Sequence, residues 1–162
     1  MKTLRKIWPW LAAAGWYGVI FFFSAQTGDA SGEISDRLAF DLLRWETDNP
    51  WTLSQVQYAF FQLVTFLLRK AAHMAVFFVL TFFLLLGLKE LIPSWKARAA
   101  AAAGLCAVLA ALDELHQYFV PGRSCQLTDV IIDLLGGLVC ILLWFLVRAV
   151  RARRAKKHAK LS

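Results

Sequence analysis

The sequence predicts an all-α, polytopic membrane protein: a bundle of four transmembrane helices, with an extracytoplasmic loop or interfacial helix between the first two. Hydrophobic residues make up 59% of the chain and concentrate in long runs. Each run is near the roughly 20 residues that an α-helix needs to cross a bilayer. The Lys and Arg residues flank these runs. The runs should be helical, because lipid offers no partner for a free backbone N–H or C=O group.

The first run, at about residues 7–24, follows a short basic stretch. This pattern also fits a signal peptide, which is the alternative. However, the apolar core is long for a signal peptide and no small-x-small cleavage motif follows it. The run is therefore predicted to be a retained transmembrane helix.

The segment after the first run is unusual for a short connection. Residues 25–52 are polar and rich in turn formers, whereas residues 53–68 are apolar and aromatic. A single helix over 54–88 would be about 52 Å long, more than the hydrocarbon core of about 30 Å. Residues 54–68 are thus expected either to lie in the outer interface or to protrude and pack on other outer parts, as a lid.

The remaining runs complete the predicted transmembrane domain, which covers residues 1–147. They lie at about 71–88, 99–119 and 127–147. Small residues in the third run, and Gly136-Gly137 in the fourth, permit close helix packing. Residues 148–162 form a basic tail.

The charge distribution predicts a multi-pass protein of the cytoplasmic (inner) membrane with both termini in the cytoplasm. The amino end, the loop around 89–98 and the tail hold thirteen of the eighteen Lys and Arg residues. Positive charge marks the cytoplasmic side. The outer segment carries acidic residues: Asp29, Glu33, Asp36, Asp41, Glu46 and Asp48. Because the basic residues border membrane spans, the net charge of +7 does not indicate a nucleic-acid partner.

Polar residues from three predicted helices fall at one depth near the outer face. Asp113 lies about 9 Å from the outer end of its run, and Asp133 lies at a similar depth in the next. Lys70 and His73 begin the second span. Carboxylates in a bilayer cost several kcal/mol and therefore need partners. The candidate partners for Asp113 and Glu114 are His116, Arg123, Lys70 and His73.

Helical spacing groups these residues further. Asp113, His116 and Gln117 share a face, as do Asp129 with Asp133 and Lys70 with His73. Glu114 is rotated away from Asp113, with the first span as one candidate neighbour. Arg69 is interpreted as an anchor that extends to the interface.

The roles expected of the polar layer are binding and, if there is a reaction, proton transfer. The predicted ligand-binding residues are Lys70, His73, Gln117, Arg123, Asp129 and Asp133. The catalytic candidates are Asp113, Glu114 and His116, and no reaction is assigned to them. No cofactor is predicted. A metal site is disfavoured, because Asp113 with His116 is not a standard ligand pair and cysteine ligands are missing.

At these residues the chain resembles the VanZ-like membrane proteins, a family associated with low-level teicoplanin resistance. The similarity covers about residues 7–147, and its most specific element is D-E-x-x-Q-x5-R-x5-D, met by Asp113, Glu114, Gln117, Arg123 and Asp129. Looser elements are Lys70-x-x-His73 and Ser24-Ala25-Gln26. Asp133 departs from the pattern, since asparagine is common there in the family. The resemblance implies a small polytopic protein and supplies no reaction.

Three functions stay open at this point. The first is a binding or resistance module for an anionic amphiphile, such as a membrane lipid, a lipid-linked cell-wall intermediate or a lipoglycopeptide. The second is an intramembrane enzyme acting on a lipid-linked phosphate or ester. The third is a small proton-coupled transporter, for which four spans would require a homo-oligomer.

Overall fold

The computed structural model describes residues 2–43 and 54–158, and every element in these ranges is an α-helix. The helices are α1 (Lys2–Ser24), α2 (Gly28–Leu43), α3 (Gln55–Leu88), α4 (Trp95–Gln117) and α5 (Leu127–His158). Four of them, α1, α3, α4 and α5, are long and apolar enough to cross a membrane. The predicted four-span fold class is confirmed. Glu46 and Asp48 of the outer segment, and the last residues of the tail, lie outside the described residues.

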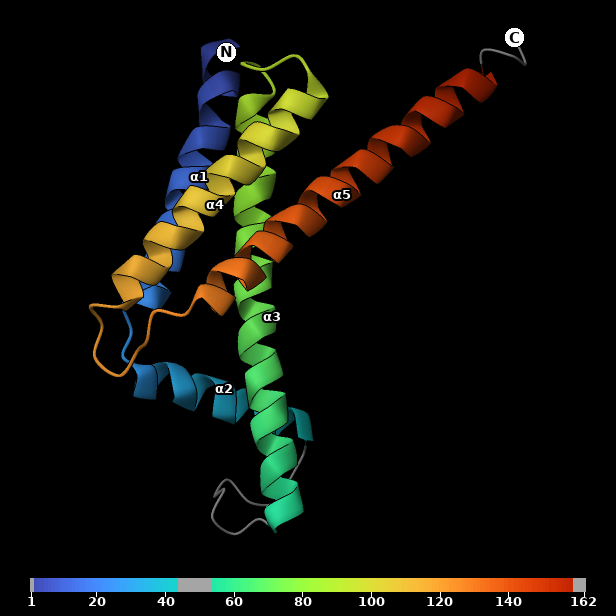
Figure 1. The fold of residues 1–162 in the computed structure, drawn as a ribbon. Helices are drawn as coiled ribbons and strands as arrows, with labels where there is room; N and C mark the ends of the chain where they lie inside the picture. The colour runs from blue at the N-terminus through green and yellow to red at the C-terminus, as the bar shows by residue number, and fades with distance from the viewer. Residues whose placement is uncertain (1, 44–53, 159–162) are drawn as a thin grey trace.

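The central helix is α3, which contacts each of the other helices (Figure 1). The core around it is built from buried apolar side chains such as Phe77, Leu80 and Leu84. Trp16 of α1 adds a hydrogen bond from its indole Nε1 to the carbonyl oxygen of Val76, at 2.8 Å. Many large apolar residues elsewhere on the helices are exposed, as expected for surfaces that face lipid.

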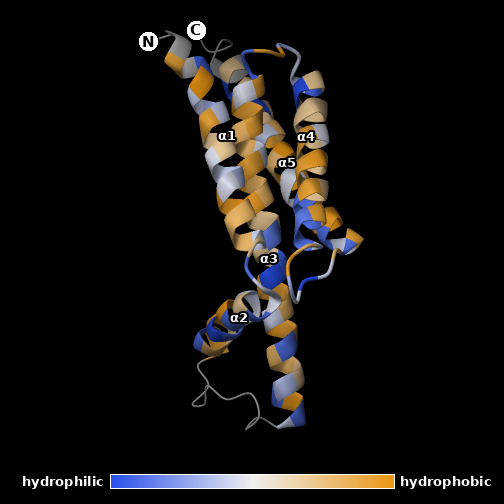
Figure 2. Cartoon of the chain, turned by 90° about the vertical axis from the view of Figure 1, so that its left-hand side faces the viewer, coloured by the Kyte–Doolittle hydropathy of each residue, from blue (hydrophilic) through white to orange (hydrophobic). Residues whose placement is uncertain are grey.

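One continuous helix spans residues 55–88, so residues 55–68 are the first part of the helix that also contains the second apolar run. A capping box starts α3: the Ser54 hydroxyl accepts from the Gln57 N–H, and the Gln57 side chain accepts from the Ser54 N–H. At 34 residues, α3 is about 51 Å long and exceeds the bilayer core. Its N-terminal part extends past the ends of α1, α4 and α5 (Figures 1 and 2).

The N-terminal part of α3 packs against α2, a helix that the turn-rich composition of residues 25–52 did not predict. Ala39 and Phe40 of α2 are buried against Phe61 of α3, and the two aromatic rings lie 4.5 Å apart between centroids. Figure 2 shows that α2 is more hydrophilic than the helices of the bundle. Packing on α3 therefore stabilises a helix whose own residues favour turns.

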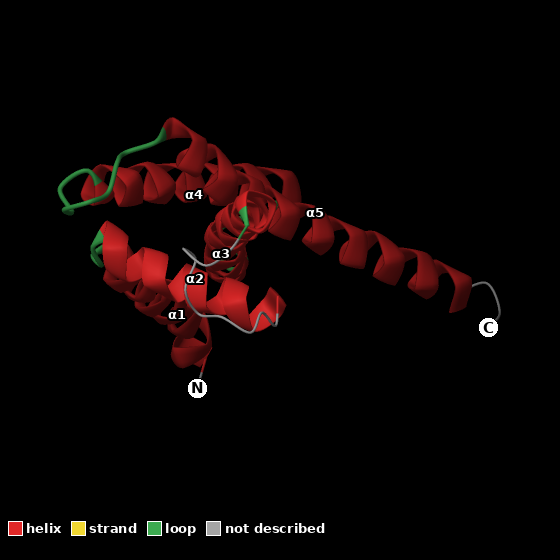
Figure 3. Ribbon diagram, turned by 90° about the horizontal axis from the view of Figure 1, so that it is seen from below, coloured by secondary structure: helices red, strands yellow, loops and turns green. Residues whose placement is uncertain are grey.

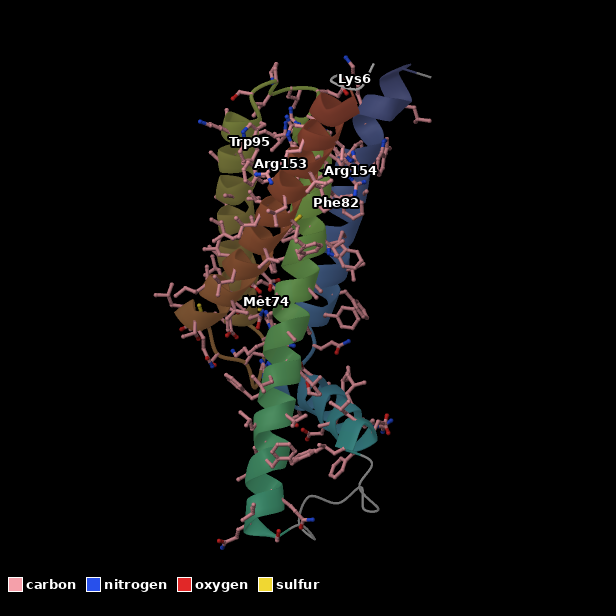
Figure 4. The ribbon with its side chains drawn as sticks, turned by 90° about the vertical axis from the view of Figure 1, so that its right-hand side faces the viewer. Lys6, Met74, Phe82, Trp95, Arg153 and Arg154 are labelled. Atoms are coloured by element: carbon pink, nitrogen blue, oxygen red, sulfur yellow. The ribbon has the colours of Figure 1, made fainter. Side chains whose placement is uncertain are left out.

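The fourth transmembrane helix crosses α3 at very short range. A Cβ atom on Gly136 would lie 2.2 Å from the carbonyl oxygen of Met74, so only glycine permits this approach. Met74 lies on α3 at this level (Figure 4). Beyond the crossing, α5 leans away from the bundle and continues through the basic residues to His158 (Figures 1 and 3). The described part of the tail is thus a helical extension of the span.

Candidate functional site

Buried polar side chains gather at the end of the bundle beside α2, where α1, α3, α4 and α5 meet. Those with at most 6% exposure there are Ser24, Asp113, Glu114, Gln117, Asp129 and Asp133. The structure therefore brings together the depth-matched residues that the sequence indicated. It divides them into two hydrogen-bonded groups.

The first group joins α1 to α4. The Asp113 Oδ2 atom accepts hydrogen bonds from Ser24 Oγ and from Gln117 Nε2, each at 2.9 Å. The Gln117 Oε1 atom in turn accepts from Arg123 Nη1 at 2.9 Å. The partners predicted for Asp113 were cations, and that prediction is wrong in detail, because a hydroxyl and an amide make its hydrogen bonds.

Arg123 also closes the carboxyl end of α1. Its Nε donates to the carbonyl oxygen of Gln26 at 2.9 Å, and its Nη2 donates to that of Phe23 at 3.1 Å. The Phe23 carbonyl also accepts from the Gln26 N–H at 3.3 Å, so Arg123 adds a second donor to it where α1 ends. A cation at this end of the helix also complements the helix dipole. Burial and the nearby Arg69 charge lower the pKa of Arg123, while Asp113 and other carboxylates oppose that shift. A guanidinium remains charged nonetheless.

Two short turns hold Arg123 in this position. The Gly28 N–H donates to the carbonyl oxygen of Pro121 at 3.2 Å, which joins the turn after α1 to the turn after α4. A Cβ atom on Gly28 would lie 2.0 Å from the Gly122 carbonyl oxygen. Gly122 itself has a φ of 74°, a left-handed conformation that favours glycine.

The second group joins α3 to α5 through two side-chain pairs one helical turn apart, a lysine–aspartate ion pair and a histidine–aspartate hydrogen bond. Lys70 Nζ pairs with Asp129 Oδ1, and His73 Nδ1 lies 3.1 Å from Asp133 Oδ1. Lys70 and His73 are three residues apart and lie on one face of α3. Asp129 and Asp133 are four residues apart and lie on one face of α5, so both pairs can form where these two faces pack together. Gly136 brings the two helices close enough for both pairs.

The three catalytic candidates do not converge. Asp113 belongs to the first group, whereas Glu114 Oε2 accepts from the backbone N–H of Gln126 at 2.8 Å. Glu114 therefore meets the turn before α5 rather than the first span. His116 stacks on Phe21 of α1, with ring centroids 4.1 Å apart.

A partly open cavity of about 300 Å³ lies between α1, α2 and α3 beside the first group. Its walls are mostly apolar, and the charged and ionisable side chains lining it are Arg69, His73, Asp113 and Arg123. Four of the predicted ligand-binding residues do not line the cavity and belong to the two hydrogen-bonded groups: Lys70, Gln117, Asp129 and Asp133.

Arg69 lines the cavity, whereas the sequence predicts it to be an anchor at the membrane interface. Its spacing of four residues from His73 places both on one face of α3, and that signal could have identified it. Within the described part of the chain, the Arg69 side chain makes no hydrogen bond or ion pair.

Several buried polar atoms of the layer also have no hydrogen-bond partner among the described residues. They include Asp113 Oδ1, Glu114 Oε1 and Asp133 Oδ2. Across residues 2–43 and 54–158, no three His, Cys, Asp or Glu side chains are arranged to hold a metal ion.

Fold and site together define a small polytopic membrane protein with a buried polar layer at one end of its bundle. The chain belongs to the VanZ/LLP1 family, whose model matches residues 9–148. This match confirms the resemblance to the VanZ-like proteins. Neither the curated proteins nor the solved structures compared with the chain gave a match.

Proposed function

We propose that this VanZ/LLP1 protein binds an anionic amphiphile in the cavity between α1, α2 and α3, and thereby contributes to glycopeptide resistance of the teicoplanin type. One observation carries the proposal. Arg69 and Arg123 both line a single, mostly apolar cavity, and Arg69 has no acidic partner in the described chain. Two like charges beside apolar walls are costly unless an anion joins them.

The geometry favours binding over catalysis. A proton-transfer mechanism needs an acid or base within reach of the bound group. Of the three catalytic candidates, only Asp113 lines the cavity, while Glu114 and His116 are directed elsewhere. Membrane lipids, lipid-linked cell-wall intermediates and lipoglycopeptides all remain within the proposed ligand class.

Binding is tested by replacing Arg69. Native mass spectrometry of detergent-purified protein with added phosphatidylglycerol should show retained lipid for wild type and clear loss for Arg69→Ala. The matched control is Arg37→Ala, because Arg37 is exposed on α2. Equal retention by both variants would reject the cavity as the binding site. Teicoplanin susceptibility at matched membrane levels tests the resistance role, and the proposal predicts that Arg69→Ala loses protection.

The same proposal places the cavity on the outer side of the bacterial cytoplasmic membrane, with both termini inside. It is supported by the basic residues near both termini of the sequence, because the start of α1 and the far end of α5 lie at the end of the molecule opposite α2 (Figures 1 and 2). In intact cells, a membrane-impermeant maleimide should label the exposed Cys125. In a Cys125→Ser background, Ser94→Cys should stay protected. Labelling of Ser94→Cys would overturn this orientation.

A further inference from the structure

The charges that face the cavity leave an excess of one positive charge. Arg69 and Arg123 contribute two cations, and Asp113 contributes one carboxylate. His73 also lines the cavity, but it is paired with Asp133 on its other side. A ligand with a single negative charge would neutralise this set. A phosphodiester has that charge, whereas a phosphomonoester carries closer to two near pH 7.

The guanidinium groups have hydrogen-bond donors left for such an anion. Three of the five Arg123 N–H groups are used by Gln26, Gln117 and Phe23. One N–H remains on each terminal nitrogen, and all five of Arg69 are free of partners within the described residues. Guanidinium donors suit the paired oxygens of a phosphate.

Asp113 adds a second requirement, for a donor on the ligand. Asp113 is 1% exposed and lines the cavity. Its Oδ2 atom has two donors, but its buried Oδ1 atom has none among the residues described. A buried carboxylate oxygen without a hydrogen bond is costly. A hydroxyl or ammonium group on the ligand would satisfy it.

The size and rim of the cavity fix which part of the ligand enters. A volume of about 300 Å³ is at the lower end for small-molecule pockets, so it suits a head group but not a whole lipid. The lining residues Phe23, Ile34 and Leu38 are 52%, 46% and 53% exposed, which makes them an apolar rim. Acyl or isoprenoid chains can lie against this rim while the head group is inside.

We infer that the cavity selects amphiphiles whose head group combines a phosphodiester with a neighbouring hydroxyl or ammonium donor, the phosphate bound by Arg69 and Arg123 and the donor by Asp113. This inference rests on the proposed function and narrows its ligand class. Asp113 is then the residue that determines specificity, and Arg69 supplies affinity for the anion.

Two pairs of lipids with identical acyl chains can test the requirement for a donor separately from the requirement for an anion. Phosphatidylglycerol and phosphatidylmethanol carry the same charge, but only the first has free hydroxyls. Phosphatidylethanolamine and phosphatidylcholine are both zwitterions, but only the first has an ammonium donor. Retention of each lipid would be measured by native mass spectrometry on the full-length wild-type chain, Asp113→Asn and Arg69→Ala.

Wild type should retain phosphatidylglycerol about tenfold better than phosphatidylmethanol, the ratio expected for one hydrogen bond to a charged acceptor. A similar preference within the zwitterionic pair would identify ammonium as a second donor source. Asp113→Asn should lose the preference, and Arg69→Ala should weaken both anionic lipids equally. The wild-type comparison decides the matter even if Asp113→Asn does not fold.

The failures are distinguishable. In one outcome, the two members of each pair are retained equally, but both anionic lipids are retained better than phosphatidylcholine. That outcome would overturn the requirement for a donor on the ligand and leave the anion site intact. Equal retention of all four lipids by wild type would overturn the proposed function itself.

Discussion

Replacement of Arg123 by lysine should destabilise the protein although the charge is kept. Arg123 donates three hydrogen bonds from three different nitrogens, to Gln26, Gln117 and Phe23, at 2.9–3.1 Å. A lysine ammonium is one point at the end of a flexible chain and can replace about one of them. Hydrogen bonds that involve a charged group are worth roughly 1.5–3 kcal/mol each, so losing two costs about 3–6 kcal/mol.

Thermal unfolding in detergent can measure this loss. Cys106 and Cys140 are buried and free, so a thiol-reactive dye reports their exposure once the exposed Cys125 is replaced by serine. The expected fall in Tm is roughly 10–20 °C for a chain of this size. The control is Arg37→Lys, which should leave Tm unchanged because Arg37 is exposed. If Arg123→Lys unfolds within about 2 °C of that control, the three hydrogen bonds of Arg123 do not hold the turns and α1 together.

Two glycine substitutions test the helix contacts that support the site. Gly28→Ala should separate the two outer turns and lower both Tm and phosphatidylglycerol retention, whereas Gly32→Ala, with open space around it, should leave both near wild type. Gly136→Ala should force α5 away from α3 and lower Tm, while Gly104→Ala meets no neighbour and serves as the control in the same unfolding assay. A Gly136→Ala protein as stable as Gly104→Ala would contradict the close crossing.

The transmembrane helices and the polar layer could be predicted from sequence because both depend on distance along the chain. Hydrophobic length gives a span, and a fixed rise per residue gives depth. Asp113 and Asp133 were therefore placed at one level without any knowledge of neighbours. The rotation of each helix about its axis was harder, since it depends on contacts such as Gly136 against Met74. For this reason the sequence indicates a cation beside Asp113, whereas the neighbouring helix α1 brings Ser24 to it. Gln117 donates to Asp113 from one turn further along α4, as their shared face predicts.

The outer segment shows where local composition misleads. Gly28, Ser31, Gly32 and Ser35 favour turns, yet residues 28–43 form α2 because Phe40 can be buried against Phe61. Amphipathic packing contributes more to helix stability in proteins than propensity does. The basic pair Arg69-Lys70 does not interrupt α3, because both residues are good helix formers.

The two neighbouring basic residues on α3 show how one sequence element serves both fold and site. Lys70 is turned toward α5 and pairs with Asp129, so its replacement would leave a buried carboxylate without a partner. Arg69 lies about 100° further round the helix and lines the cavity.

Loss of function in Lys70→Ala would therefore be accompanied by a fall in Tm, as it would in Arg123→Ala. Arg69→Ala should lower lipid retention with Tm close to wild type, because its side chain supports no other described residue. A Tm loss as large as that of Lys70→Ala would show that Arg69 belongs to the framework and would remove the main argument for an anion site.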